Sequence, residues 1–346
     1  MKTAKGQRRS ITRAKRQPKA AASQSSAKFP SKRNAKNAPE AAQVPQAMDK
    51  SGNTLPINVT HPDKVFWPEE GYTKFDLVKF YQAIFPTLWP YVDDRVLSLE
   101  RCPDGMNGQC FFQKETPKGM PAGTPTKRIR HVGGSSESTN YVLGGALETQ
   151  LALANLGCIA VHVMGSRASA PRQPDWVCFD LDPQSGKFAD AARAAQYVRE
   201  ALESLKLIPF VKTSGSRGMH VFVPIQVGPD AAEVLSFAES LVARLASAHP
   251  AELTVEHSIA ARGTRVYLDP FRNGFGQTVV APYSVRRRPH APVSMPLAWP
   301  ELKSSLDPAS FNIGNVAEWS KREDAWKHFF SAPQDLKQAA ALLNKA

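Results

Sequence analysis

The chain of 346 residues is 42% hydrophobic, which is enough apolar material for the core of one large domain or two smaller ones. Its formal net charge is +13, but residues 1–50 hold 13 Lys and Arg against two acids, and the rest of the chain is nearly neutral. This distribution argues against a broadly basic surface, so a binding site for an anionic partner should be a local groove.

The first 53 residues are rich in Ala, Ser, Gln and Pro and contain only Glu40 and Asp49 as acids. Few apolar residues and a high net charge predict a disordered basic arm at 1–53. Such an arm would attract phosphates in a salt-dependent way, or it would simply keep the chain soluble. We favour the nucleic-acid-binding arm.

Neither a signal-peptide core nor a run of eighteen apolar residues occurs, which predicts an intracellular, cytoplasmic protein without a membrane partner. The four cysteines, Cys102, Cys110, Cys158 and Cys178, form no Cys-x-x-Cys pair. The sequence therefore predicts no structural zinc site and does not imply disulfides.

The first regular element should be a helix that begins after Thr73, a suitable N-cap with Asp76 three residues later. Its apolar stripe is Leu77, Val78, Tyr81 and Ile84. We expect it to end before Pro86. From 95 to 141, short apolar runs alternate with Gly, Pro and Asn, which predicts strands and loops, and a second helix is expected at about 147–156.

The second half has a regular order of strand, helix, strand, strand, helix and strand. These elements are expected at 176–181, 188–207, 208–213, 220–225, 231–249 and 265–269. This is the split βαβ order of ferredoxin-like and RNA-recognition-type sheets, in which the fourth strand lies beside the first. The tail at 292–346 should be a loop followed by helices.

Two acids stand two residues apart in "WVCFDLDP", at the end of the first of these strands. In an extended strand, Asp180 and Asp182 project to the same side with Cα atoms about 6–7 Å apart. Their repulsion is roughly 2–3 kcal/mol at an effective dielectric constant near 20, unless a cation lies between them. The fourth strand would add Asp269, and three such acids would suit a pair of divalent cations; a solvated strand end is the ordinary alternative.

Further polar groups could bind an anion. The turn "KTSGSRGMHV" offers backbone amides beside glycines, the Ser214 hydroxyl, Arg217 and His220, although it could also be an ordinary hairpin. "YSVRRRPH" is a basic run that could be a solvated face. Phe111 and Phe112 could stack on a base, or one of them could be buried.

Taken together, these stretches closely resemble the polymerase domain of bacterial DNA ligase D, in the archaeo-eukaryotic primase superfamily. The matching pieces are "THPDKVFWPEEGYTKFDLVKFY", "CFFQK", "LGCIAVHV", "GSRASAPRQPDWVCFDLDP", "KTSGSRGMHVFVP", "RVYLDPFRNGFGQTVVAPYSVRRRPHAPVS" and "PLAW". They occur in family order across about 55–302.

The resemblance implies an α+β primase-polymerase fold, with an RRM-like or ferredoxin-like βαββαβ catalytic sheet and an N-terminal α/β subdomain. On this basis we expect a catalytic domain at 54–302, with an N-terminal part at 54–160 and an RRM-like part at 161–302. A C-terminal helical extension would follow at 303–346. The ligase and phosphoesterase domains are absent from the sequence, so we expect a stand-alone polymerase.

The implied activity is template-directed transfer of DNA or RNA nucleotides that fills gaps and extends DNA ends in non-homologous end joining, with a preference for ribonucleotides. The implied cofactors are two divalent ions, Mn²⁺ or Mg²⁺, with nucleoside triphosphates as substrates. The implied partners are DNA ends or gapped DNA with a 5′ phosphate, Ku and a separate DNA ligase, at the bacterial nucleoid.

The resemblance also assigns roles to residues. Asp180, Asp182 and Asp269 would be the catalytic metal ligands. The nucleotide would be contacted by Ser214, Arg217, His220, His162, Arg262 and Arg286. DNA would be contacted by Lys64, Phe111, Phe112 and Lys114, with the two lysines at a downstream 5′ phosphate.

Four residues, at three places in the chain, depart from the family pattern. Arg217 stands where Lys is usual, and a planar fork replaces a point charge there. Val163 and Met164 replace a common Pro-Trp after His162, and Pro270 replaces an aromatic residue after Asp269. These changes bear on the nucleotide pocket and on the backbone beside the third acid.

Other functions remain open. A primase of the same superfamily would begin strands rather than extend them, and a DNA-end-binding protein would use the same surface without catalysis. A phosphatase or a sugar-nucleotide transferase could also use an Asp-x-Asp pair. The haloacid-dehalogenase type of phosphatase is disfavoured because Gln184 stands where Thr or Val is expected.

Overall fold

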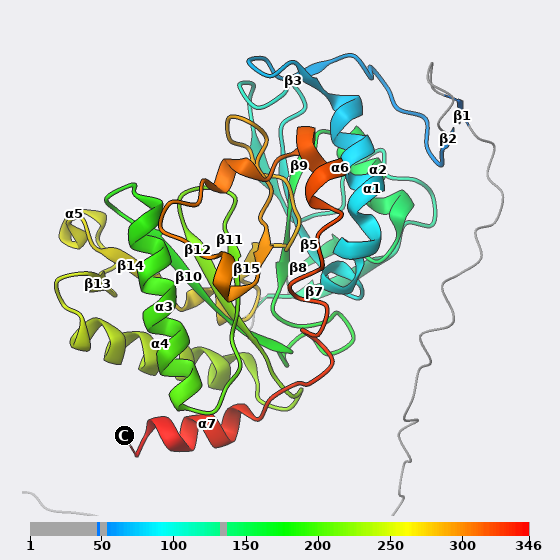
Figure 1. The fold of residues 1–346 in the computed structure, drawn as a ribbon. Coiled ribbons are helices and arrows are strands. Elements are labelled where there is room, and N and C mark those ends of the chain that lie inside the picture. The colour runs from blue at the N-terminus through cyan, green and yellow to red at the C-terminus, as the bar shows by residue number, and fades with distance from the viewer. Residues whose placement is uncertain (1–46, 49–53, 132–136, 346) are drawn as a thin grey trace, which may run out of the picture. The chain divides into compact units, whose positions relative to one another are not determined.

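The computed structural model describes residues 47–48, 54–131 and 137–345, all within one compact unit at 45–346 (Figure 1). Apart from Ala47 and Met48, which form a two-residue strand, the predicted basic arm at 1–53 lies outside the described residues. Within the described part of the chain, no helix is both long and apolar enough to cross a membrane.

The central sheet has the strand order β13-β14-β10-β12-β11-β16. Its strands are β10 (Trp176–Pro183), β11 (Phe210–Thr213), β12 (Met219–Pro224), β13 (Leu253–Thr254), β14 (Val266–Asp269) and β16 (Pro296–Leu297). Strand β14 pairs with β10, and β12 lies on the other side of β10. The expected βαββαβ order and the placement of its fourth strand beside the first are therefore confirmed.

A second sheet has the order β15-β9-β5-β6. Its strands are β5 (Leu97–Arg101), β6 (Phe111–Gln113), β9 (Cys158–Met164) and β15 (Thr278–Val280). Three strand pairs lie outside the two larger sheets: β1 (Ala47–Met48) with β2 (Thr54–Leu55), β3 (Val65–Trp67) with β4 (Tyr72–Thr73), and β7 (Thr126–Arg130) with β8 (Ser138–Val142). Because β15 comes from the later half of the chain, the second sheet joins both halves.

The helices pack on one face of each sheet. In Figure 1, α3 and α4 lie against the central strands, while α1 and α2 lie together beside β5 and β9. Their bounds are α1 (Lys74–Val92), α2 (Leu147–Asn155), α3 (Phe188–Ser204) and α4 (Ala231–Ala248). Short helices follow at α5 (Ile259–Arg262), η1 (Phe271–Asn273), η2 (Trp299–Glu301), η3 (Pro308–Ser310), η4 (Ile313–Asn315), α6 (Val316–Trp319) and α7 (Leu336–Leu343).

Helix α1 begins as predicted but ends later. The Thr73 side chain accepts from the backbone of Asp76, and the Asp76 carboxylate accepts from the backbone of Thr73, which is a complete capping box. The helix continues through Pro86 to Val92, so the expected end before Pro86 was wrong. Each interior proline removes a backbone hydrogen bond, but the buried side chains of Leu88 and Tyr91 continue the apolar face.

The face of the central sheet opposite α3 and α4 has two parts. Along β10, Trp176 and Asp180 share this face because side chains alternate. At the Trp176 end, Trp176 packs on Phe222 with ring centroids 5.5 Å apart, and Phe222 packs on Trp326 at 5.4 Å. Trp326 also stacks on Phe329 at 4.8 Å. The 303–346 segment therefore contributes to the same core as the central sheet.

The sequence prediction that disulfides are not implied was wrong for one pair. Cys102 and Cys110 are joined by a disulfide, while Cys158 and Cys178 are free and buried. The pair lies at the end of the β5–β6 hairpin, where strand pairing brings together residues that are eight apart in sequence. Cysteine spacing alone could not show this because the hairpin register was unknown.

Replacing Trp326 with Ala should destabilise the whole described unit by about 3–5 kcal/mol, because this side chain is 1% exposed and contacts four aromatic rings. Urea unfolding should show a single transition at lower denaturant. Lys303→Ala, at an exposed position of the same segment, is the control. A separate transition for the C-terminal segment would contradict a shared core.

Candidate active site

A row of four ionisable side chains, called here the cross-strand row, runs across the central sheet. Asp180 of β10 lies directly opposite Asp269 of β14 on one side and His220 of β12 on the other. Lys212 of β11 lies opposite His220. Directly paired residues on neighbouring strands project to the same face, so all four side chains lie on the face away from α3 and α4.

The end of β14 keeps this register in place. Pro270 is the N-cap of the short helix η1, which turns the chain back toward β10. The Asn273 side chain then accepts from the backbone N–H of Cys178 at 2.8 Å and donates to its carbonyl at 2.7 Å. The Asn273 side-chain amide thus makes the two hydrogen bonds to β10 that a further residue of β14 would otherwise make. The departure at Pro270 is accommodated by this turn.

Two carboxylates are held by cationic and polar partners. His220 Nε2 lies 3.2 Å from Asp180 Oδ1, and Arg272 Nε lies 3.1 Å from Asp180 Oδ2. Arg272 Nη2 lies 3.3 Å from Asp269 Oδ2, so one guanidinium bridges both acids. The two carboxylates converge on the same point.

The two acids differ in pKa. Burial alone would raise the pKa of Asp180, but the charges and hydrogen bonds of His220 and Arg272 lower it well below its usual range. Burial raises the pKa of Asp269, and the negative charge of Asp180 adds to this, against the opposing charge of Arg272. A positive charge between the carboxylates stabilises both ionised forms.

Asp182 is on the same face as Asp180 and Asp269 but does not share their contact with Arg272. It is exposed, lies opposite Tyr267 of β14, and its Oδ2 accepts from the Gln184 side chain at 3.0 Å. In the described residues, no group of three His, Cys, Asp or Glu side chains is arranged to hold a metal ion. The chemistry of the donors still fits: carboxylate oxygens suit Mg²⁺ or Mn²⁺, and the Arg272 guanidinium already supplies a cation there.

Three buried polar atoms around the cross-strand row lack a hydrogen-bond partner among the described residues: His162 Nε2, His220 Nδ1 and Arg286 Nε. Burial, and then the charge of Lys212, lower the pKa of His220 to about 4, so its imidazole is neutral at pH 7. Burial, and then the charge of Arg286, lower the pKa of His162 well below its usual value. Unsatisfied buried polar atoms are costly, which indicates a polar ligand at this place.

The turn between β11 and β12 is built close to the cross-strand row. The Ser214 Oγ accepts from the backbone N–H groups of Ser216 and Gly218, each at 3.2 Å, which leaves its hydroxyl proton available to donate. Gly215 has φ +68°, and a Cβ there would lie 2.5 Å from Arg286 Cγ. Only glycine allows the turn to approach Arg286 this closely. Arg286 in turn donates to the Ser214 carbonyl at 2.6 Å.

Two further arginines lie on the rim. Arg217 is exposed at the tip of the turn, and a Cβ at Gly186, in the segment that follows β10, would lie 3.2 Å from its Nη1. Arg262 stacks on the ring of Tyr267, with 3.5 Å from its Cζ to the ring centroid, and Tyr267 lies opposite Asp182. Arg262 therefore lies near Asp182, and Arg217 lies near the segment that follows β10.

The predicted DNA-contacting residues lie on and near β6. Phe111 and Phe112 are 42% and 63% exposed, so neither is buried. The Phe112 ring packs edge-on against His162 with centroids 5.3 Å apart, which links β6 to the nucleotide side of the site. Lys114 is exposed just after β6. Lys64 pairs with Asp104 at 2.5 Å, in the loop that leads to β6.

Three charged residues near the candidate site were not among the predicted site residues. Arg272 bridges the acids, Lys212 completes the cross-strand row, and Lys74 lies close enough to Lys64 that burial and this neighbouring charge lower its pKa. Of these three, only Arg272 could have been found from the sequence, because it stands three residues after Asp269 in a turn.

Among the residues that depart from the family pattern, Met164 packs in a small core with Ile129 and Tyr141.

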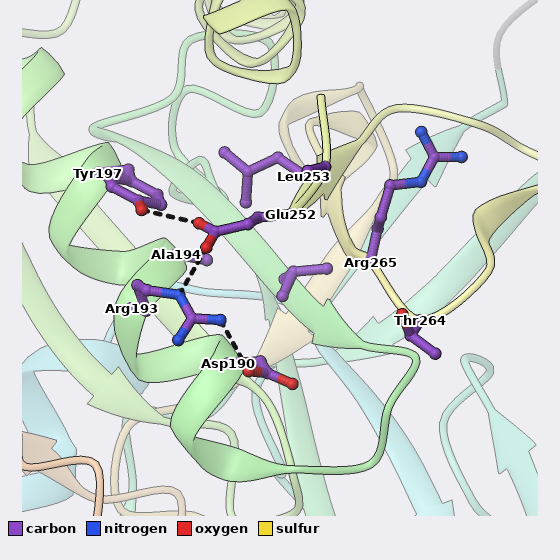
Figure 2. A pocket seen from close by; sticks show the side chains of 10 residues that line it. Asp190, Arg193, Ala194, Tyr197, Glu252, Leu253, Thr264 and Arg265 are labelled. Atoms are coloured by element: carbon purple, nitrogen blue, oxygen red, sulfur yellow. Dashed lines mark hydrogen bonds and ion pairs between the residues drawn. The ribbon is translucent and has the colours of Figure 1, made fainter. Parts of the chain in front are cut away.

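A cavity of about 160 Å³ lies elsewhere, between α3 and the β13–β14 edge, and contains none of the predicted site residues (Figure 2). Its polar groups satisfy one another. Arg193 pairs with Asp190 at 2.9 Å and with Glu252 at 3.3 Å, and the Tyr197 hydroxyl donates to Glu252 at 2.7 Å. These side chains are therefore already paired, unlike the polar atoms beside Asp180.

The family model of the LigD primase-polymerase domain matches residues 73–326. The chain belongs to this family. The resemblance expected from the sequence is thereby confirmed, and the matched LigD primase-polymerase region includes every residue of the cross-strand row and all the proposed nucleotide contacts.

Similar proteins are the LigD proteins of Mycobacterium tuberculosis (strain ATCC 25618 / H37Rv) and Bacillus subtilis (strain 168). The first, a multifunctional non-homologous end joining DNA repair protein, is 29% identical over 262 residues, which are 73% of this chain and 34% of that protein. The second, a bifunctional non-homologous end joining protein, is 29% identical over 291 residues, which are 83% of this chain and 46% of that protein. The chain thus spans less than half the length of these LigD relatives.

A solved structure of the polymerase domain from M. tuberculosis ligase D in complex with DNA has a TM-score of 0.74 to this chain. The two are 26% identical, and the match covers 80% of this chain and 99% of that domain. The α+β primase-polymerase fold expected from the sequence is therefore confirmed for the LigD primase-polymerase region.

Lys212 allows a pH test of the cross-strand row. Burial lowers its pKa from 10.5 to about 7, with Arg286 adding to the shift and Cys178 and Asp180 opposing it. Between pH 7 and pH 10.5, the Lys212 side chain is protonated in the unfolded chain and largely unprotonated in the folded protein. The free energy of unfolding should therefore rise with pH across this window. Between pH 7 and pH 9, the wild type should gain about 2 kcal/mol more than Lys212→Met in urea unfolding. Equal pH slopes for the two proteins would contradict a buried Lys212 with a lowered pKa.

Proposed function

We propose that this protein is a template-directed nucleotidyltransferase that fills gaps and extends DNA ends during non-homologous end joining, with a preference for ribonucleotides. The observation that carries the proposal is the juxtaposition of two converging carboxylates with three buried polar atoms that lack a partner in the described part of the chain. Carboxylates suit metal binding, and the surrounding basic groups suit a polyphosphate. Membership of the LigD primase-polymerase family supports this proposal.

The residues divide into three roles. Asp180 and Asp269, with Asp182, would hold two divalent cations, Mn²⁺ or Mg²⁺. These ions would neutralise charge on the triphosphate and activate the primer hydroxyl. Arg272 would give up its place between the acids or share it, since its guanidinium occupies the region where their oxygens converge.

The chain's own groups would position the nucleotide. The free hydroxyl proton of Ser214, the exposed Arg217 and the buried Nε of Arg286 are donors suited to phosphate oxygens. His220 is neutral, and its Nε2 faces a carboxylate, so that nitrogen carries the proton and Nδ1 remains an acceptor. His220 thus both orients Asp180 and can accept a hydrogen bond from the substrate. His162 and Arg262 would complete the nucleotide contacts.

DNA would approach along β6. Phe111 and Phe112 present aromatic rings to solvent, and base stacking on such rings contributes about 1–3 kcal/mol per base. Lys64 would bind the 5′ phosphate downstream of the gap, together with Lys114, which directly follows β6. In the solved LigD polymerase domain the partner is also DNA. Ku and a separate ligase as partners, and a location at the nucleoid in the bacterial cytoplasm, are parts of this proposal.

The deciding assay uses purified protein, gapped DNA with a 5′ phosphate, Mn²⁺ and labelled ribonucleotide or deoxynucleotide. Templated addition to the primer is the expected result, with ribonucleotide used more efficiently. Free phosphate release without extension would indicate a hydrolase, and synthesis that begins without a primer would indicate a primase. DNA binding with no incorporation would indicate an end-binding protein.

Asp180→Asn and Asp182→Asn should each reduce incorporation by at least about 100-fold, because each removes a charged metal ligand while keeping the side-chain volume. Binding of gapped DNA should stay within about threefold, since no acid contacts DNA in the proposal. Glu239→Ala, an exposed acid on α4, is the control. Full synthesis by either Asn variant would refute the assignment of these metal ligands.

Phe112→Ala should weaken binding of gapped DNA by about 1–3 kcal/mol, which is about fivefold to 150-fold in Kd. It should also raise the nucleotide KM, because the Phe112 ring packs against His162. Phe112→Tyr keeps the aromatic face, so its DNA affinity and its nucleotide KM should stay close to those of the wild type. Unchanged DNA affinity in the Ala variant, measured by fluorescence anisotropy, would remove β6 from the DNA surface.

A further inference from the structure

The disulfide lies at a defined place in the second sheet. Strands β5 and β6 pair through Leu99 with Gln113, Glu100 with Phe112, and Arg101 with Phe111. The next pair in this register is Cys102 with Cys110, with Cα atoms 4.3 Å apart. The disulfide therefore adds one covalent link, called here the covalent rung, next to the three residue pairs of the β5–β6 ladder.

Strand β6 depends on few other contacts. It has three residues, lies at the edge of its sheet and, among the described strands, pairs with β5 alone. Both of its phenylalanines are exposed, so little apolar burial holds it in place. The covalent rung directly precedes Phe111, which makes it the closest restraint on the aromatic pair.

The same bond closes the loop 103–109. Within this loop, Met106 donates its backbone N–H to the Phe66 carbonyl at 2.9 Å, and Asp104 pairs with Lys64. The bond thus restrains two features that the proposed function assigns to DNA, the aromatic strand and the partner of Lys64. Neither feature belongs to the cross-strand row.

The four cysteine sulfurs differ in their access to reagents. Cys110 is half-buried at the surface end of the hairpin, while its partner Cys102 is buried. The other two thiols are buried, and burial raises the pKa of Cys158 to about 12 and that of Cys178 well above its usual value. Only the thiolate reacts readily with oxidants, so these two thiols are protected.

We propose that Cys102 and Cys110 form a reversible redox site, in which a hydroperoxide makes the disulfide and a small thiol breaks it, and that the oxidised form holds β6 in position for DNA. In the oxidation, the Cys110 sulfur attacks the peroxide oxygen and becomes a sulfenic acid while water, or an alcohol from an organic peroxide, leaves. The Cys102 sulfur then attacks the Cys110 sulfur and releases water. In reduction, two thiols transfer two electrons and two protons to the pair and become a disulfide themselves.

The first test counts thiols in the intact protein. After hydrogen peroxide and removal of excess oxidant, alkylation under denaturing conditions should label two cysteines, Cys158 and Cys178. After dithiothreitol, it should label all four. Cys110→Ser should show three labelled cysteines in both cases. Four labelled cysteines in the peroxide-treated wild type would overturn the proposal.

The second test asks whether the bond restrains β6. Hydrogen exchange of the amides at 104–113 should be slower in the oxidised wild type than in the reduced protein, because the bond limits the open conformations of the loop. Cys110→Ser should exchange at the reduced rate in either buffer, and Cys102→Ala is a second variant with the same expected behaviour. Equal exchange in oxidised and reduced wild type would overturn the restraint.

The third test measures the link to DNA, which rests on the proposed function. The oxidised wild type should bind gapped DNA about fivefold more tightly than the reduced protein, while Cys110→Ser should not respond to peroxide. Equal binding by both redox forms of the wild type would overturn the link. Redox-dependent exchange with no DNA binding in either form would instead uphold the redox site and contradict the proposed function.

Discussion

The antiparallel pairing of β10 with β14 is the constraint on which the site depends. It places Asp180 opposite Asp269, so that one guanidinium reaches both carboxylates. A shift of one residue in this pairing would move Asp269 to the opposite face of the sheet. The Asn273 amide, which satisfies both backbone groups of Cys178 just beyond the end of β14, prevents such a shift without extending the strand.

Around these two acids, the buried groups are mostly basic. Lys212, Arg272 and Arg286 place basic groups here, and burial together with their charges lowers the pKa of His162 and His220. Their neutral form follows from burial and from repulsion by these cations. Such a cluster of basic groups would stabilise a polyanion held beside the carboxylates, as the proposed nucleotide transfer requires.

The site is assembled from parts that are far apart in the chain. His162 and Phe112 come from the second sheet, the Ser214 turn from the first, and Arg286 from the segment after β15. The C-terminal aromatic residues cover the other end of the same sheet face and so confine the polar groups to one half. Strand β6 carries exposed rings at the edge, where a covalent rung compensates for the small number of contacts.

The sequence by itself determined the local and periodic features: the capping box of α1, the βαββαβ order, the common face of Asp180 and Asp182, and the motifs of the LigD primase-polymerase family. These follow from short-range geometry and alternation along a strand. Only the tertiary structure decided the continuation of α1 past Pro86, the Cys102–Cys110 bond, and the positions of Arg272 and Lys212. Each of these depends on strand register or on burial against distant segments, and neither is encoded in the spacing of nearby residues.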